Sequence, residues 1–427
     1  MLFVFRISHL GSALGARWTA PSWSRPGAGD SSSSNVRPDG RARAHCRTHR
    51  FSALPALEQL AFGALRRSKD LRFAPSAHGA RSRGSRGSVL SSSTVRVAGE
   101  KPVDRIAADF MGLTFPERGT AMVLGYTKPL CILPFDHRAS YLSKMFGYAE
   151  PLTAEQHARV VDSKRVIYEG FVEALRAGVS PETSGILVDE EFGAAILRDA
   201  KASNYITAVS TERSGQKEFE FEYGDEFGSH LAAFHPTFAK ALVRYNPDGD
   251  AALNERQTKR LVALSSYCSR ARLPLMFELL VPATDAQLRK VDGDKDAYDL
   301  NLRPALMRAA IETLQDKGVE PAVWKVEGLL RREDGERLVE TARRQGRSEV
   351  GCIVLGRGAS EAKVEKWLRT AASIPGYIGF AVGRTTFWDS VADYEAKKIS
   401  REEAANAIAT RYREWVDVFE SARVNPA

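Results

Sequence analysis

The feature that most constrains the fold is a regular alternation that begins after Met122. Short apolar runs of about five residues recur, and each is followed by a turn and then by a longer stretch with helical spacing. Strands that are joined through helices pair in parallel, because the helix returns the chain to the same end of the sheet. We predict eight strands, at Cys131–Phe135, Gly185–Val188, Tyr205–Val209, Ala241–Arg244, Leu275–Leu279, Ala322–Val326, Cys352–Leu355 and Ile378–Val382.

Eight parallel strands are the number that closes an α/β barrel, the (β/α)8 or TIM barrel. Two of the intervening segments have clear helix starts, one at Thr153 with Glu155 in the first turn and one at Ser360 with Glu361. An open doubly wound sheet also alternates strands and helices, but no GxGxxG turn follows the first strand here. We therefore expect residues 122–427 to form one (β/α)8 barrel.

Residues 1–121 precede this pattern, and we expect them to be a disordered, Arg/Ser-rich leader of low complexity. Residues 1–100 hold 15 Arg and one Lys against five acidic residues, a net charge of +11, so the other 327 residues carry −3. Such a segment buries too little apolar surface to offset its chain entropy. Its composition is also typical of an organellar transit peptide, but no convincing amphipathic helix accompanies it. Translation that starts at Met122 is a further alternative. The basic charge lies outside the barrel, which argues against a nucleic-acid-binding barrel.

The four cysteines show no CxxC pair and no spacing typical of a metal cage or a disulfide framework. Cys131 and Cys352 lie in strand-like apolar runs, so we expect them to be small buried residues. No stretch reaches the roughly 20 apolar residues that a membrane span requires. We expect a soluble, cytoplasmic protein that has no membrane partner.

Charged residues end or follow most of the predicted strands, and in barrel enzymes the catalytic groups lie at these carboxyl ends. Lys325 and Glu327 share one face of their strand, whereas Trp324 and Val326 share the other. If the bulky face packs on helices, Lys325 points into the barrel mouth. Burial there and a nearby Arg244 would favour the neutral amine, which attacks a carbonyl. The alternative is a lysine neutralised by Glu327 or Glu278.

Glu278 lies inside an apolar strand, where an unpaired carboxylate is costly. It is a candidate proton carrier, and a salt-bridge role is compatible with this. The turns Gly356-Arg357-Gly358 and Gly383-Arg384 follow the last two strands, where barrels commonly bind phosphate. Glycine lets backbone N–H groups approach the phosphate and arginine supplies a two-pronged donor; a pair of solvated loops is the alternative.

These segments resemble a known family. ILPFDHR (132–138), VDEEFG (188–193), LVRYNPD (242–248), FELLVP (277–282), VWKVEGL (323–329), GCIVLGRGA (351–359) and GFAVGRTTFWD (379–389) are similar to segments of 5-dehydro-2-deoxyphosphogluconate aldolases, the C-terminal aldolase domains of the kinase/aldolase proteins of myo-inositol breakdown. The family is distantly similar to the tagatose-bisphosphate aldolases, which are Schiff-base barrels. No sugar-kinase domain precedes the barrel in this sequence, so no kinase activity is expected.

The resemblance implies cleavage of 2-deoxy-5-keto-gluconate 6-phosphate into dihydroxyacetone phosphate and malonic semialdehyde, without a cofactor. It implies that Lys325 forms the imine and that Glu278 moves protons. Asp136 and Arg244 would position hydroxyls or the carboxylate, and Arg357 and Arg384 would hold the phosphate. Further expected substrate-binding residues are Arg138, Asp189 and Glu327.

Two other readings stay open. A metal-dependent aldolase needs several converging histidines, but only His137, His157, His230 and His235 lie in the barrel and only His137 ends a strand, so no metal is expected. A barrel that only binds a sugar phosphate would share the site but show no turnover. The sequence leaves a homo-oligomer open as well.

Overall fold

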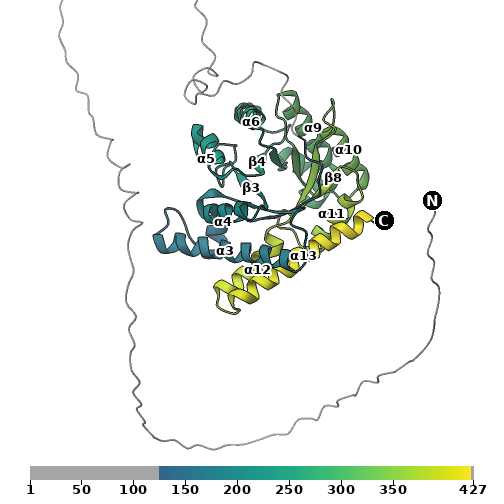
Figure 1. The fold of residues 1–427 in the computed structure, drawn as a ribbon. Helices are drawn as coiled ribbons and strands as arrows, with labels where there is room; N and C mark the ends of the chain where they lie inside the picture. The colour runs from purple at the N-terminus through teal and green to yellow at the C-terminus, as the bar shows by residue number, and fades with distance from the viewer. Residues whose placement is uncertain (1–124, 425–427) are drawn as a thin grey trace, which may run out of the picture. The chain divides into compact units, whose positions relative to one another are not determined.

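The computed structural model describes residues 125–424. The predicted leader at 1–121, a start at Met122 and Cys46 lie outside this range. Within it, eight parallel strands form a closed barrel in which each strand pairs with the next and β8 pairs with β1. The predicted fold class is therefore confirmed, and Figure 1 shows the strands inside a ring of helices.

All eight predicted strands are present, with ends that shift by at most three residues. They are β1 (Leu130–Pro134), β2 (Ser184–Val188), β3 (Ile206–Ser210), β4 (Phe238–Arg244), β5 (Leu275–Leu280), β6 (Val323–Glu327), β7 (Gly351–Leu355) and β8 (Tyr377–Ala381). The largest difference is at β4, which begins three residues before the predicted Ala241 and so includes Lys240. That difference bears directly on the site.

Both predicted helix starts are confirmed. At the first, the Thr153 hydroxyl accepts from the Gln156 N–H while the Gln156 side chain accepts from the Thr153 N–H. The segments around the barrel are α2 (Ala139–Tyr141), η1 (Leu142–Phe146), α3 (Ala154–Arg176), α4 (Glu190–Ala202), η2 (Gly224–Glu226), α5 (Phe227–Phe234), α6 (Ala251–Ala271), α7 (Asp285–Arg289), α8 (Lys295–Asn301), α9 (Arg303–Asp316), α10 (Arg332–Ala342), α11 (Glu361–Ala372), α12 (Arg384–Glu395) and α13 (Arg401–Val424).

The strand side chains divide into an inner and an outer set. Ile132, Met276, Val323 and Ile353 belong to a small apolar cluster inside the barrel, below the carboxyl ends of the strands. Trp324 and Val326 belong to the larger cluster between strands and helices. Since side chains alternate along a strand, Lys325 points inward on top of Val323, as the sequence predicts.

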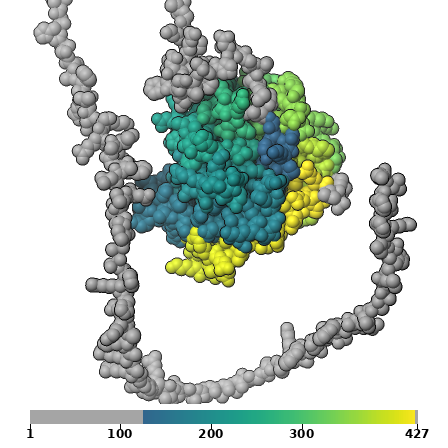
Figure 2. Space-filling model, in the orientation of Figure 1, coloured from purple at the N-terminus to yellow at the C-terminus, as the bar shows by residue number. Residues whose placement is uncertain are grey.

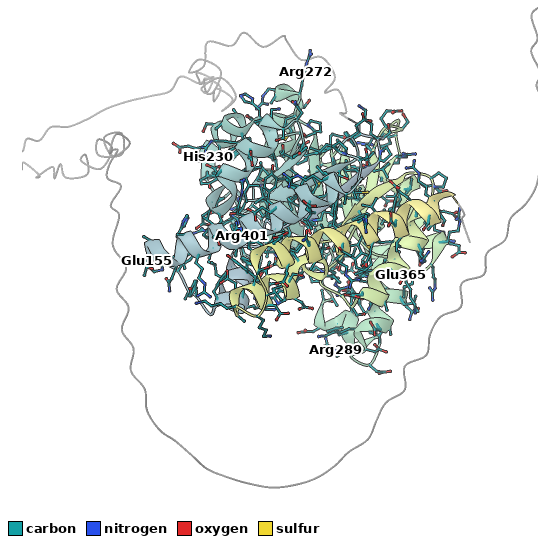
Figure 3. All side chains as sticks on the ribbon, turned by 60° about the horizontal axis from the view of Figure 1, so that its bottom comes forward. Glu155, His230, Arg272, Arg289, Glu365 and Arg401 are labelled. Carbon is teal, nitrogen blue, oxygen red and sulfur yellow. The ribbon has the colours of Figure 1, made fainter. Side chains whose placement is uncertain are left out.

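The last helix, α13, packs against α3, the first long helix of the described residues. Helix α13 lies along α3, as Figures 1 and 3 both show. In Figure 2, yellow residues near the C-terminus lie beside blue residues from the first part of the barrel. Arg401, labelled in Figure 3, pairs with Glu169 at 2.7 Å and with Asp162 at 2.8 Å. The buried Tyr412 hydroxyl donates to the Cys131 carbonyl at 2.7 Å. These contacts attach α13 to α3 and to β1.

The three cysteines in the described range, Cys131, Cys268 and Cys352, are free and buried. Burial raises the pKa of the Cys268 and Cys352 thiols to about 12, so neither is a reactive thiolate. Among the helices of residues 125–424, none is both long and apolar enough to cross a membrane.

Candidate active site

A cavity of about 310 Å³ lies at the carboxyl ends of the strands. Ten of the twelve predicted site residues line it: Asp136, Arg138, Arg244, Glu278, Lys325, Gly356, Arg357, Gly358, Gly383 and Arg384. Asp189 and Glu327 are the other two, and they do not line it. Most of the predicted residues, from six different segments, are thus brought to one place.

Lys325 and Glu278 are register partners on neighbouring strands. The Lys325 ammonium lies 2.8 Å from a Glu278 oxygen, and both side chains are buried. Of the two carboxylates that the sequence offered as partners for Lys325, the structure selects Glu278. A direct path for a proton between the amine and the carboxylate therefore exists.

A second lysine, which the sequence analysis missed, lies beside this pair. Lys240 on β4 is fully buried, and its ammonium contacts Asp136 at 2.7 Å, Glu212 at 2.6 Å and Glu278 at 2.9 Å. Lys240 and Lys325 contact the same oxygen of Glu278. Two ammonium groups and three carboxylates thus form one continuous network at the floor of the cavity.

The network keeps its carboxylates ionised. Burial favours the neutral forms of Asp136 and Glu278, but Lys240 and Lys325 outweigh it and lower the pKa of both carboxyl groups. Burial also opposes the charge on Lys240, but Asp136, Glu212 and Glu278 together raise its pKa. Lys240 is therefore a permanent cation, whereas Asp136 and Glu278 are hydrogen-bond and proton acceptors.

Glu212 is a further group that the sequence analysis missed. It follows β3 and is buried, with one oxygen on Lys240 and the other accepting from the Leu242 N–H at 3.1 Å. Arg138 holds the same loop, because its guanidinium donates to the Glu212 carbonyl and pairs with Glu222 at 2.6 Å. Arg138 lines the cavity, but these bonds already engage its guanidinium.

Asp189 lies away from the cavity and is fully buried. One of its oxygens accepts from the Phe192 N–H at 2.9 Å and so caps α4, while the other pairs with the buried Lys164. Both oxygens are thus used within the protein, and the structure does not bring Asp189 to the predicted substrate. The residue is an N-cap.

Glu327 is likewise engaged in the protein. Its oxygens accept from the Val281 N–H at 2.9 Å and pair with the buried Arg303 at 3.1 Å and with Arg357 at 3.2 Å. Arg357 also pairs with Asp299 at 2.9 Å. The predicted phosphate ligand Arg357 therefore lines the cavity with its charge already balanced, and Glu327 positions it.

Arg384 differs from Arg357 in having no carboxylate partner among the residues that the structure describes. Its Nη2 donates to the Arg357 carbonyl at 2.9 Å, and burial lowers the pKa of its guanidinium. It is the first residue of α12; the Thr386 and Phe387 N–H groups donate to the Gly383 carbonyl, whereas the N–H groups of Arg384 and Thr385 have no partner among the described residues. A short helix that begins after the last strand is a common phosphate site in barrels.

Two glycines open this end of the cavity. A Cβ on Gly358, where φ is +67°, would come within 2.6 Å of the Arg384 guanidinium. A Cβ on Gly383 would come within 2.2 Å of the Pro134 carbonyl. Both positions therefore require glycine for the turn to sit close to Arg384, as the two Gly-Arg turns suggested.

Arg244 lies at the rim. Its side chain is exposed, and Nη1 donates to the Gln216 carbonyl at 2.9 Å. The cation that shares a carboxylate oxygen with Lys325 is Lys240, whereas Arg244, which was expected nearby, lines the same cavity at its rim. Arg244 is still positioned to meet a negatively charged end of a ligand at the mouth.

A larger cavity, of about 580 Å³, lies outside the barrel mouth between α8 and α11. Its charges are largely balanced within it, since Lys363 pairs with Asp296 at 2.7 Å and Arg303 pairs with Asp299 at 2.9 Å. The described residues contain no group of three His, Cys, Asp or Glu side chains that could hold a metal ion. The chemistry of the smaller cavity is that of an amine and carboxylates.

Residues 120–423 match the model of a family described as "Uncharacterized protein conserved in bacteria (DUF2090)". The match covers more than two thirds of the chain. The chain belongs to this family. At greater distance, this DUF2090 chain is similar to tagatose 1,6-diphosphate aldolase 1 of two Streptococcus pyogenes strains, with 23% identity over 307 residues, 67% of this chain and 88% of the relative.

Solved structures with a similar fold include fructose-bisphosphate aldolase from Plasmodium falciparum, with 15% identity, 70% of this chain, 91% of that chain and a TM-score of 0.48. Cgl0159 from Corynebacterium glutamicum matches with 16% identity, 69% and 88% coverage and a TM-score of 0.43. The distant similarity to tagatose-bisphosphate aldolases that the sequence analysis expected is confirmed. The assignment to 5-dehydro-2-deoxyphosphogluconate aldolases stays a prediction.

Proposed function

We propose that this DUF2090 protein is a sugar-phosphate aldolase that acts through a Schiff base on Lys325. The observation that supports this most is the network in which Lys325 contacts one carboxylate, Glu278, at the floor of a cavity at the barrel mouth. The similarity to tagatose 1,6-diphosphate aldolases supports the same reaction class.

Lys325 is a better nucleophile than Lys240 on physical grounds. Lys240 contacts three carboxylates, which raise its pKa and hold it as an ammonium without a free electron pair. Lys325 contacts Glu278 alone and can pass its proton to that carboxylate. Lys240 then serves as a fixed positive charge that keeps Asp136 and Glu278 ionised.

The steps follow from this arrangement. Lys325 first gives one proton to Glu278, and the neutral amine attacks the keto carbon. Glu278 passes that proton to the oxygen to form the hydroxyl, then takes a second proton from the attacking nitrogen and gives it to the hydroxyl, which leaves as water to give the iminium ion. Asp136 accepts the proton of the hydroxyl on the carbon beyond the scissile bond. That C–C bond breaks, its electrons form the enamine, and an aldehyde leaves. Protonation of the enamine carbon and addition of water then release the ketone.

The phosphate would bind at Arg384, the opening N–H groups of α12 and the two glycine turns. Arg384 supplies the unpaired charge there. For 2-deoxy-5-keto-gluconate 6-phosphate, the keto carbon neighbours the phosphate-bearing carbon, so a phosphate at Arg384 brings that carbon to Lys325. The carboxylate at the other end of this substrate would face the rim, where Arg244 lies. The products would be dihydroxyacetone phosphate and malonic semialdehyde.

The test is reduction of the imine in place. Protein incubated with dihydroxyacetone phosphate and borohydride is digested, and the modified peptide is identified by mass spectrometry. We expect modification at Lys325 alone, and no change when Lys363 outside the cavity is replaced by methionine. Modification at Lys240 would relocate the imine, and no modification at any lysine would overturn the proposal.

A further inference from the structure

His137 follows Asp136 directly at the end of β1, and the steps proposed above do not use it. Among the four histidines of residues 125–424, it alone lines the central cavity. His157 lies on α3 against Phe192, and His230, at the periphery of Figure 3, hydrogen-bonds Glu190 at 2.8 Å. His137 is therefore the histidine of residues 125–424 that can contact a ligand in this cavity.

The imidazole of His137 is fixed by packing rather than by hydrogen bonds. Its ring meets Phe387 edge to face, with 6.3 Å between centroids. Nδ1 is shielded from solvent and has no hydrogen-bond partner in the described part of the protein. A shielded N–H without an acceptor is rarer in proteins than a shielded acceptor. The tautomer with the proton on Nε2 is therefore favoured. Nε2 is not shielded in the way that Nδ1 is, and His137 lines the cavity, so Nε2 is the ring nitrogen that a ligand there can reach.

Burial, more than the charges around it, holds the His137 ring neutral. Burial lowers its pKa to about 4; Asp136 opposes that shift, Arg384 and Lys325 add to it, and Glu278 opposes it. Asp136 and Glu278 can only accept hydrogen bonds, whereas Lys325 and Arg384 can only donate and carry charge. His137 is the group among them that donates without a charge.

We infer that His137 donates a hydrogen bond from Nε2 to the keto oxygen of the substrate while Lys325 attacks the keto carbon. This rests on the proposed function. His137, Lys325 and Arg384 line the same cavity, and the charges of Lys325 and Arg384 both act on the imidazole. The keto carbon of a 1-phosphorylated ketone is bonded to the phosphate-bearing carbon, so a ligand with its phosphate at Arg384 and its keto carbon at Lys325 brings the keto oxygen into this cavity beside His137.

In this step the Lys325 nitrogen forms the C–N bond and the two π electrons of the carbonyl move to its oxygen. His137 stabilises that developing charge through its N–H and keeps its proton. The proton that completes the hydroxyl comes from the attacking nitrogen through Glu278. A neutral donor suits this task, since it strengthens as the charge develops and does not neutralise the carboxylates.

The experiment compares His137→Leu, which removes the donor, with His137→Gln, which keeps an N–H. The rate of imine formation with dihydroxyacetone phosphate is measured by quenching with borohydride at short times. We expect a loss of about 10²- to 10³-fold for leucine, the usual effect of losing one oxyanion donor, and most of the rate back for glutamine. His157→Leu is the matched control and should leave the rate unchanged.

If wild-type protein forms no imine at all, the proposed function fails. If wild-type protein forms the imine and His137→Leu forms it at the same rate, only the role of His137 fails. Should the leucine variant not fold, His137→Ala is assayed with added imidazole. Recovery of the rate by imidazole supports the inference, and no recovery overturns it.

Discussion

Replacing Lys240 by methionine removes the cation that three carboxylates share while keeping most of the volume of the side chain. Lys240 lies 2.7, 2.6 and 2.9 Å from the oxygens of Asp136, Glu212 and Glu278. At an effective dielectric constant near 20, each contact corresponds to about 6 kcal/mol of Coulomb attraction, most of which offsets the desolvation of the charges.

The net effect of removing one member of a buried ion pair is typically about 3–5 kcal/mol of lost stability. We expect Lys240→Met to lose at least this much at pH 7, because three carboxylates rather than one lose their partner. Urea unfolding followed by circular dichroism measures the loss. Lys363→Met is the matched control, since Lys363 pairs with the exposed Asp296, and it should cost less than about 1 kcal/mol.

The sign of the pH dependence follows from the pKa shifts. Asp136 and Glu278 have pKa values lowered in the folded state, so their stabilisation is present above the unfolded value near 4 and is lost as the pH falls through the folded values. The raised pKa of Lys240 contributes stability below about pH 10.4, which is lost at higher pH as the folded value is passed. The difference between wild type and Lys240→Met should therefore shrink as the pH falls below 4.

Activity should respond as well. Without Lys240, the pKa values of Asp136 and Glu278 rise, and the acid limb of kcat/KM moves upward by about one to three pH units. A variant with wild-type stability and an unshifted acid limb would refute the reasoning, because it would show that the ion network is not the source of the ionised carboxylates.

Three further changes test other parts of the site. Arg384→Gln should raise KM for a phosphorylated ketose more than tenfold relative to wild type, as measured by steady-state kinetics of both proteins with the same substrate. An unchanged KM would place the phosphate elsewhere. Asp189→Asn should cost about 3–5 kcal/mol of stability through the buried Lys164 and lower kcat little, as measured by urea unfolding and steady-state turnover; a large loss of kcat in folded protein would return Asp189 to the substrate. Prolonged treatment with EDTA should leave turnover unchanged, and a loss of turnover that zinc restores would contradict imine catalysis.

The barrel could be predicted because each strand is a short apolar run between turns, and all eight runs are present in the sheet. The inward direction of Lys325 also followed from alternation along β6. Lys240 was missed because a charged residue between Ala239 and Ala241 resembles the end of a turn rather than the middle of a buried strand. Its three partners, which make burial tolerable, lie just after β1, just after β3 and on β5, and are distant in sequence.

Asp189, in contrast to Lys240, was predicted as a site residue but lies away from the cavity. An acidic residue after a strand fits both a barrel rim and a helix N-cap, and Glu190 and Glu191 in the next turn were a signal for the N-cap. Lys164 on α3, 25 residues earlier, completes that role, and no local pattern pairs it with Asp189. The sequence thus indicates which strand ends carry charge, while the folded contacts separate the carboxylates that face the cavity from those used in the frame.

The central claim is that Lys325, rather than Lys240, forms the imine. Borohydride reduction in the presence of dihydroxyacetone phosphate, with peptide mass mapping of wild type, Lys325→Met and Lys240→Met, tests it most directly. We expect modification at Lys325 in wild type and none in Lys325→Met, with modification at Lys325 retained in Lys240→Met. Modification at Lys240 in the wild type, or undiminished modification in Lys325→Met, would contradict the claim.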